Sequence, residues 1–154
     1  MKIIYKQGDL LSCEERWILH GCNAQGVMGS GVARDIRTHY PSAYEVYLAQ
    51  HSKGWQKLGT VTFAMQNCQR FVFNGITQEF YGRDGKQYVD YKAVEDVIWC
   101  MNKHAQASDD YLEGKTLRVA MPKIGAGLGG GDWDVISKII EEESTNFQPV
   151  VYTL

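Results

Sequence analysis

The chain has 154 residues, a length typical of one domain that buries its own hydrophobic core. An apolar fraction of 44% and a charged fraction of 22% are ordinary for a globular protein, and a net charge of −2 excludes a broad basic surface for nucleic acid. No stretch approaches the roughly 18 apolar residues of a membrane helix, and the first apolar run is too short for a signal peptide. We therefore expect one cytoplasmic, monomeric domain over 1–154 with no membrane partner.

Four cysteines are present, Cys13, Cys22, Cys68 and Cys100. They form no C-x-x-C pair, and no histidine lies at zinc-ligand spacing from two of them. The sequence therefore predicts no metal site, and we expect the cysteines to be reduced, buried apolar residues. No cofactor is expected.

In the first part of the chain, short apolar runs predict strands at 3–6 and 17–22. A glycine-rich loop follows at 26–31. Apolar residues at helical spacing then predict a helix over 32–40 that ends before a proline, and a second helix over 42–52.

The middle of the chain contains two β-rich runs, 59–65 and 70–76, which we expect to be neighbours joined by a turn at 66–69. Residues 77–89 carry many polar and turn residues, which indicates a surface loop that lies over a site. The strongest helical pattern of the chain covers 90–106.

Near the end, the sequence predicts a strand at 116–122, a helix from Trp133 to Ile140 and a last strand at 150–154. Strands that alternate with helices predict an α/β sandwich whose parallel or mixed sheet is covered on both faces. In such folds the ligand lies at the carboxyl ends of the strands.

Two glycine-rich loops, 23–33 and 124–132, each follow a predicted strand and precede a predicted helix. Such loops bring free backbone N–H groups and a helix N-terminus against an anion, so the pair could hold two adjacent phosphates. Neither loop contains the lysine of a Walker motif. "GAGLGG" matches the dinucleotide fingerprint, but too little chain follows it for that fold. The remaining alternative is that the glycines only form tight turns.

The segments "GDLL", "HGCNAQGVMGSGVA", "MPKIGAGLGGGDW" and "VYTL" together resemble the macro domain. The similarity is greatest to the branch with the ADP-ribose 1″-phosphate phosphatases and the hydrolases that remove terminal ADP-ribose from glutamate. The resemblance covers about residues 3–154. It implies a three-layer α/β/α sandwich with a mixed sheet and a cleft for ADP-ribose.

The resemblance also implies individual roles. Asp9 would accept from the adenine amino group, Tyr152 would flank the adenine, and Asn23 would contact the distal ribose. The glycine loops would hold the diphosphate from two sides. On the residues alone, Asp9 and Asn23 also fit turns and Tyr152 fits a core strand. The full set implied to contact ADP-ribose is Asp9, Leu10, Asn23, Gly29, Ser30, Gly31, Val32, Ala33, Ile124, Gly125, Ala126, Gly127, Leu128, Gly129 and Tyr152.

The chain departs from the glutamate-hydrolysing members, which carry a lysine after the "IT" strand end and an aspartate after "GxGL". Gln78 and Glu79 stand near the first position and Gly129 stands at the second. A lysine-mediated mechanism is therefore not expected. His20, with Cys22 and Asn23, fits the pattern of the phosphatase-like members.

Three residues are catalytic candidates: His20 as an acid or base, Asn23, and Asp132 as a carboxylate that orients water. His20 also fits a core histidine, and Asp132 fits the N-cap of the last helix. Asp35 is a further candidate that also fits a solvated helix residue.

Three functions follow from these residues. The first is a metal-independent ADP-ribose 1″-phosphate phosphatase, and the second is a non-catalytic module that binds free or protein-linked ADP-ribose. The third is a hydrolase of an ADP-ribosyl adduct on protein or nucleic acid. The expected partner is ADP-ribose or a derivative, including ADP-ribosylated protein, while nucleic acid is not favoured by the charge.

Overall fold

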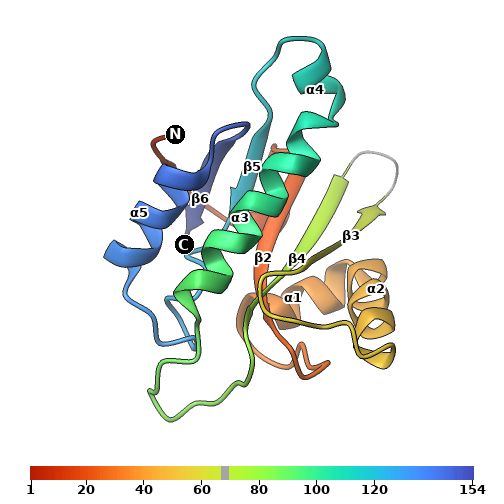
Figure 1. Cartoon of the computed structure of the whole chain (residues 1–154), viewed down its shortest axis with the longest axis vertical. Coiled ribbons are helices and arrows are strands. Elements are labelled where there is room, and N and C mark those ends of the chain that lie inside the picture. The colour runs from red at the N-terminus through yellow and green to blue at the C-terminus, as the bar shows by residue number, and fades with distance from the viewer. Residues whose placement is uncertain (67–69) are drawn as a thin grey trace.

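A computed structural model describes residues 1–66 and 70–154 and shows a six-stranded sheet between two layers of helices (Figure 1). Every pair of neighbouring strands is parallel except β3 and β4, which are antiparallel. The predicted α/β/α sandwich with a mixed sheet is therefore confirmed. In spatial order the strands are β1 (Ile4–Gln7), β6 (Gln148–Thr153), β5 (Arg118–Met121), β2 (Trp17–Asn23), β4 (Arg70–Gln78) and β3 (Val61–Gln66).

The helices cover the two faces because side chains of each strand alternate in direction. Ile18 packs in a cluster with α1 (Gly31–His39) and α2 (Pro41–Ser52). Its neighbour Leu19 packs on the opposite face with α3 (Tyr91–Gln106) and α5 (Trp133–Glu143). Figure 1 shows α3 and α5 side by side over one face of the sheet.

The predicted helices and strands are present, with ends that differ by at most three residues. The last strand begins earlier than predicted, at Gln148, and includes Pro149. Proline usually argues against a central strand, because it lacks the N–H of the ladder. Here it is the second residue of the strand, where the ladder is just beginning.

Two short elements were not predicted, the 3-10 helix η1 (Leu10–Ser12) and α4 (Asp109–Leu112). Neither is long enough to show a hydrophobic period. Of the turn predicted at 66–69, residues 67–69 lie outside the described residues. Among the helices of 1–66 and 70–154, none has both the length and the apolarity needed to cross a membrane.

Candidate functional site

A cavity of about 580 Å³ opens at the carboxyl ends of β2, β4 and β5. This volume lies within the usual range for small-molecule sites. Both glycine-rich loops line it. The predicted ligand contacts that line it are Asn23, Gly29, Ser30, Gly31, Val32, Ala33, Ile124, Gly125, Gly127, Leu128 and Gly129.

The first glycine loop leads into α1, whose N-terminus has no side-chain cap among the described residues. Ser30 occupies the N-cap position but makes no capping hydrogen bond, whereas Asp90 caps α3 and Asp132 caps α5. The first N–H groups of a helix have no partner within it. In the described structure, the N–H groups of Gly31, Val32 and Ala33 are therefore unpaired and carry the positive end of the helix dipole.

The second glycine loop is folded back on itself. Gly131 donates to the carbonyl of Gly125 at 2.8 Å, and Gly130 donates to the carbonyl of Gly127 at 3.0 Å. Within the described residues, the N–H groups of Gly127, Leu128 and Gly129 have no hydrogen-bond partner. Gly130 has a φ of +70°, and a Cβ there would lie 2.2 Å from the carbonyl oxygen of Lys86. Only glycine fits that position.

The charged side chains among the described residues that line the cavity are all positive. Arg83 and Lys123 line it, and none of the described lining residues is an aspartate or a glutamate. The Arg83 guanidinium donates to the Ser30 hydroxyl at 2.7 Å. The Lys123 ammonium lies 5.9 Å from the centre of the Trp133 ring. Two cations and two sets of free N–H donors make this cavity suited to an anion.

His20 lies beneath the cavity with 1% of its surface exposed. Asn74 donates from its amide to the carbonyl of Ala43, so its oxygen faces His20, and His20 Nε2 donates to it at 2.6 Å. Burial lowers the pKa of His20 to about 4, although the bond to Asn74 opposes that shift. Burial also raises the pKa of the adjacent Cys22 thiol. At neutral pH both groups are uncharged.

Asn23 ends β2 and holds the first glycine loop in place. Its amide donates to the carbonyl of Val27 at 2.8 Å, and its side-chain oxygen accepts from Gln25 N–H and from the Tyr47 hydroxyl. One amide hydrogen has no partner among the described residues and is available at the cavity wall. Asn23 thus stabilises the turn and also lines the cavity.

Asp132 is exposed and does not line the cavity. Its carboxylate accepts from the N–H of Asp134 at 2.9 Å, which confirms the predicted N-cap of α5. Asp35 is exposed on α1 and also lies outside the lining residues. Neither carboxylate therefore reaches the cavity wall in this structure.

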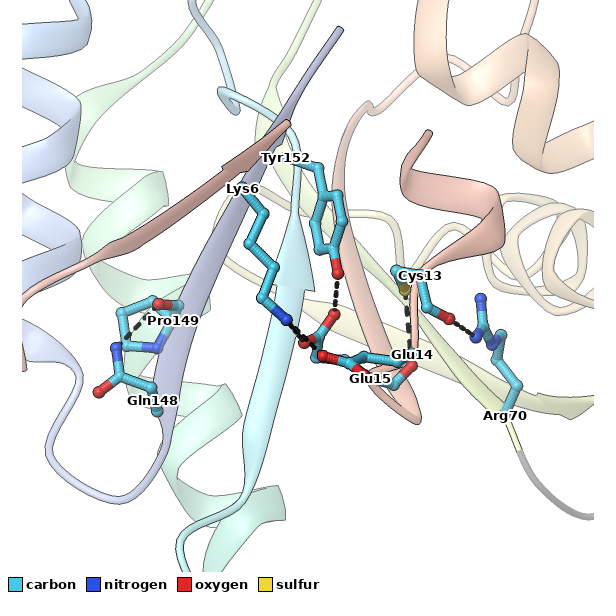
Figure 2. A network of polar contacts seen from close by, with 8 residues as sticks. All are labelled: Lys6, Cys13, Glu14, Glu15, Arg70, Gln148, Pro149 and Tyr152. Atoms are coloured by element: carbon cyan, nitrogen blue, oxygen red, sulfur yellow. Dashed lines mark hydrogen bonds and ion pairs between the residues drawn. The ribbon is translucent and has the colours of Figure 1, made fainter. Parts of the chain in front are cut away.

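Four predicted ligand contacts, Asp9, Leu10, Ala126 and Tyr152, are not among the lining residues. Asp9 caps η1 by accepting from Leu11 N–H, and Leu10 is buried. Tyr152 donates from its hydroxyl to the buried carboxylate of Glu15 (Figure 2). Asp9 and Leu10 follow β1, Tyr152 lies in β6, and Ala126 lies in the loop after β5.

Some residues that line the cavity were not predicted from the sequence. The loop 77–89 was predicted to lie over a site, and its Tyr81, Gly82 and Arg83 do line the cavity. No sequence pattern singled out Arg83 from the other cations. Lys123 directly precedes the second glycine loop, and that position was a usable signal. No group of three His, Cys, Asp or Glu suited to a metal occurs in the part of the chain that the structure describes.

The macro domain family model matches residues 19–140. The chain is a macro domain. This macro domain is 30% identical, over 98% of its length and 96% of the other's, to an uncharacterized 17.5 kDa protein in the tk-vs intergenic region of Enterobacteria phage T4. It is 27% identical, over 99% of its length and 98% of the other's, to the ADP-ribose 1″-phosphate phosphatase of Candida glabrata.

A third relative is longer. The macro domain is 23% identical to the DNA ADP-ribosyl glycohydrolase of Thermus aquaticus over 90% of its own length, but spans only 36% of that protein. Relatives in the family thus include hydrolases of ADP-ribose derivatives with different names.

Solved structures share the fold. A Bacteroides thetaiotaomicron protein of unknown function superposes with a TM-score of 0.84 at 28% identity, over 100% of this macro domain and 99% of that chain. Thermosipho africanus DarTG, solved in complex with ADP-ribose, has a TM-score of 0.74 at 20% identity, over 97% of this macro domain and 41% of that chain.

Proposed function

We propose that this macro domain binds ADP-ribose and removes phosphate from ADP-ribose 1″-phosphate. The observation that carries the proposal is the cavity that combines two sets of free N–H donors with two cations and no carboxylate among its described lining residues. A ligand with several phosphate groups satisfies these donors, and full-length similarity to a named phosphatase supports the choice.

In the proposed complex the diphosphate lies between the N-terminus of α1 and the 127–129 loop. The adenine extends along the rim to Asp9, Leu10 and Tyr152, and the distal ribose lies against Asn23. The bond from Tyr152 to Glu15 holds the tyrosine ring in one orientation at that rim (Figure 2). The diphosphate contacts pair backbone N–H groups that have no partner among the described residues with phosphate oxygens that accept hydrogen bonds.

Hydrolysis would proceed by attack of water on the terminal phosphorus. A new P–O bond forms, the bond between phosphorus and O1″ breaks, and the proton released by water ends on O1″, which yields ADP-ribose and inorganic phosphate. Charge gathers on the phosphoryl oxygens in the transition state. Free N–H groups and the Lys123 ammonium would stabilise that charge without rearrangement.

Three predicted candidates receive distinct roles in this proposal. Asn23 contacts the ribose that carries the reacting phosphate. His20 has a structural role at the floor of the cavity and no acid–base role, because its Nε2 proton is donated to Asn74 and its pKa is lowered to about 4. Asp132 stabilises α5 through its cap.

Hydrolysis of a glutamate ester by the lysine and aspartate of related proteins is not supported. Gln78 lines the cavity, and its amide donates to the carbonyl of Phe80 at 2.7 Å. A side chain at position 129 is also disfavoured, because a Cβ there would lie 2.8 Å from the Gly125 carbonyl oxygen and 3.1 Å from the Gln78 side chain.

A second candidate is a non-catalytic ADP-ribose-binding module. The observation that favours it is the lack of a carboxylate among the described lining residues, since a carboxylate is a common base for activating water.

Two measurements separate these functions, namely phosphate release from ADP-ribose 1″-phosphate and calorimetric binding of ADP-ribose. We expect both. Binding without phosphate release would replace the phosphatase with the binding module, and release of ADP-ribose from modified DNA or protein would replace it with an adduct hydrolase. Absence of ADP-ribose binding would refute the proposal.

A further inference from the structure

We propose that Arg83 contacts the phosphate groups of the ligand directly and makes the cavity selective for phosphate-bearing compounds. This inference rests on the proposed function and names a specificity residue that the sequence patterns did not indicate. Arg83 lies in the loop between β4 and α3, whereas the predicted phosphate contacts all come from the glycine loops.

The loop that carries Arg83 is held in a defined shape. The Tyr88 hydroxyl donates to both carboxylate oxygens of Asp84, at 2.8 and 2.9 Å, and Lys86 N–H donates to the same carboxylate at 3.2 Å. Gly82 packs so closely on Tyr88 that a Cβ at position 82 would lie 2.3 Å from the tyrosine oxygen. These contacts flank Arg83 on both sides and fix the backbone from which it extends.

The same loop is attached to both walls of the cavity. At its end, the N–H groups of Tyr88 and Val89 donate to the carbonyl of Gly129, at 2.7 and 3.0 Å. At its middle, Arg83 reaches across to Ser30 of the first glycine loop. The loop therefore connects the two walls of the cavity, and Arg83 is the residue that contacts the first glycine loop.

The bond to Ser30 leaves most of the Arg83 guanidinium unused. Of its five N–H donors, one is committed to the serine hydroxyl, and Arg83 has no ion pair within the described residues. Asp84, the nearest carboxylate in sequence, is committed to Tyr88. A guanidinium binds phosphate through two parallel hydrogen bonds, which are stronger than its bond to a neutral hydroxyl.

Ser30 directly precedes the unpaired N–H groups of α1, so an anion bound there lies within reach of the guanidinium. The phosphate then replaces the Ser30 hydroxyl as acceptor for Arg83. The phosphate is then bound by the N-terminus of α1 on one side and by Arg83 on the other. Compounds without a phosphate group cannot make this contact, so Arg83 adds nothing to their affinity.

The test is calorimetric binding of ADP-ribose and of inorganic pyrophosphate to wild type and three variants. For Arg83→Gln we expect both affinities to fall on the order of tenfold to a hundredfold, the usual effect of losing charged hydrogen bonds. Arg34→Gln removes the same charge from an exposed site on α1 that does not line the cavity, and we expect less than a threefold effect. Arg83→Lys should recover only part of the lost affinity, because lysine binds phosphate at a single point.

Ser30→Ala separates ligand contact from loop closure. If Arg83 acts only by bridging to Ser30, removing the hydroxyl must weaken binding as much as Arg83→Gln does, and that result would overturn the inference. We expect Ser30→Ala to lose clearly less affinity than Arg83→Gln does. Equal affinities of Arg83→Gln and wild type would also overturn it.

The pyrophosphate measurement keeps this inference distinct from the proposed function. Wild type that binds pyrophosphate but not ADP-ribose would refute the proposed function, and the loss of pyrophosphate binding in Arg83→Gln would still support the role of Arg83. Wild type that binds neither compound would overturn both.

Discussion

Two regions of the molecule, the cavity and the network around Glu15, differ in how their polar groups are paired. At the ends of β2, β4 and β5, a cavity is lined by two cations, Arg83 and Lys123, and by backbone N–H groups that have no partner among the described residues. Beside β1 and β6, the carboxylate of Glu15 is almost fully buried and accepts from both Lys6 and Tyr152 (Figure 2). Polar groups that the fold needs are paired within the protein, and those left unpaired are available to a ligand.

The electrostatics of the Glu15 network follow from the same pairing. Burial raises the pKa of Glu15, but hydrogen bonds from Lys6 and Tyr152 outweigh burial and hold the pKa below its ordinary value. Burial and the bond to Glu15 raise the pKa of Tyr152 to about 12. The network therefore stays as a carboxylate bound to an ammonium and a neutral phenol at neutral pH.

The largest expected effect comes from breaking this network. Glu15→Ala should lower the free energy of unfolding by about 3 to 5 kcal/mol, because it removes the buried partner of Lys6 and Tyr152. Urea unfolding at pH 7 measures the loss. Glu14→Ala is the matched control, since Glu14 also pairs with Lys6, at 2.6 Å, but its side chain is 77% exposed. Equal losses of unfolding free energy in the two variants would contradict the importance of the buried Glu15 network.

Acidification tests whether His20 belongs to the core or to the chemistry of the cavity. Its pKa is lowered from 6.5 to about 4, so the unfolded chain takes up a proton first as pH falls. The contribution of neutral His20 to the free energy of unfolding is fully present above about pH 6.5. The free energy of unfolding should then fall by about 3 kcal/mol as the pH drops to 4.

Urea unfolding across this range, with His20→Gln as the comparison, measures the effect. The variant should lose this part of the pH dependence of stability. The substrate phosphate itself ionises with a pKa of about 6, so any inflection of turnover in this range should be the same in wild type and His20→Gln. An inflection that disappears in His20→Gln would make His20 an acid–base candidate again.

Gly130→Ala should disturb the cavity wall. Its φ of +70° and the Lys86 carbonyl oxygen, 2.2 Å from an added Cβ, force the 127–129 loop to move. We expect a loss of about 2 kcal/mol in stability and weaker ADP-ribose binding. Gly127→Ala adds a methyl group into open space, so its melting temperature should match that of wild type. Equal melting temperatures of Gly130→Ala and wild type would argue against a strained loop.

The smallest expected effect concerns the cap of α5. Asp132→Ala should cost about 1 kcal/mol of stability, whereas Asp132→Asn should cost much less because asparagine caps as well as aspartate does. Phosphate release should be unchanged in both, since Asp132 lies outside the cavity lining. Loss of turnover in Asp132→Asn at wild-type stability would place the carboxylate in catalysis.

Local patterns predicted much of this molecule. The spacing of apolar residues gave helices such as α3, and glycines between a strand and a helix indicated both walls of the cavity. The N-cap of α5 was also predictable, because a cap depends on residues adjacent in sequence. Where the pattern was shorter than a period, as in η1 and α4, it gave no prediction.

The sequence by itself determined the alternation of strands and helices and the position of the two glycine loops, since both depend on neighbouring residues. Only the tertiary structure decided which polar groups are paired. Glu15 meets Tyr152, 137 residues away, and Arg83 meets Ser30, 53 residues away. His20 is buried and donates to Asn74, 54 residues away. Burial and hydrogen-bond partners arise from packing between distant segments, and they distinguish the open cavity from the internally paired network around Glu15.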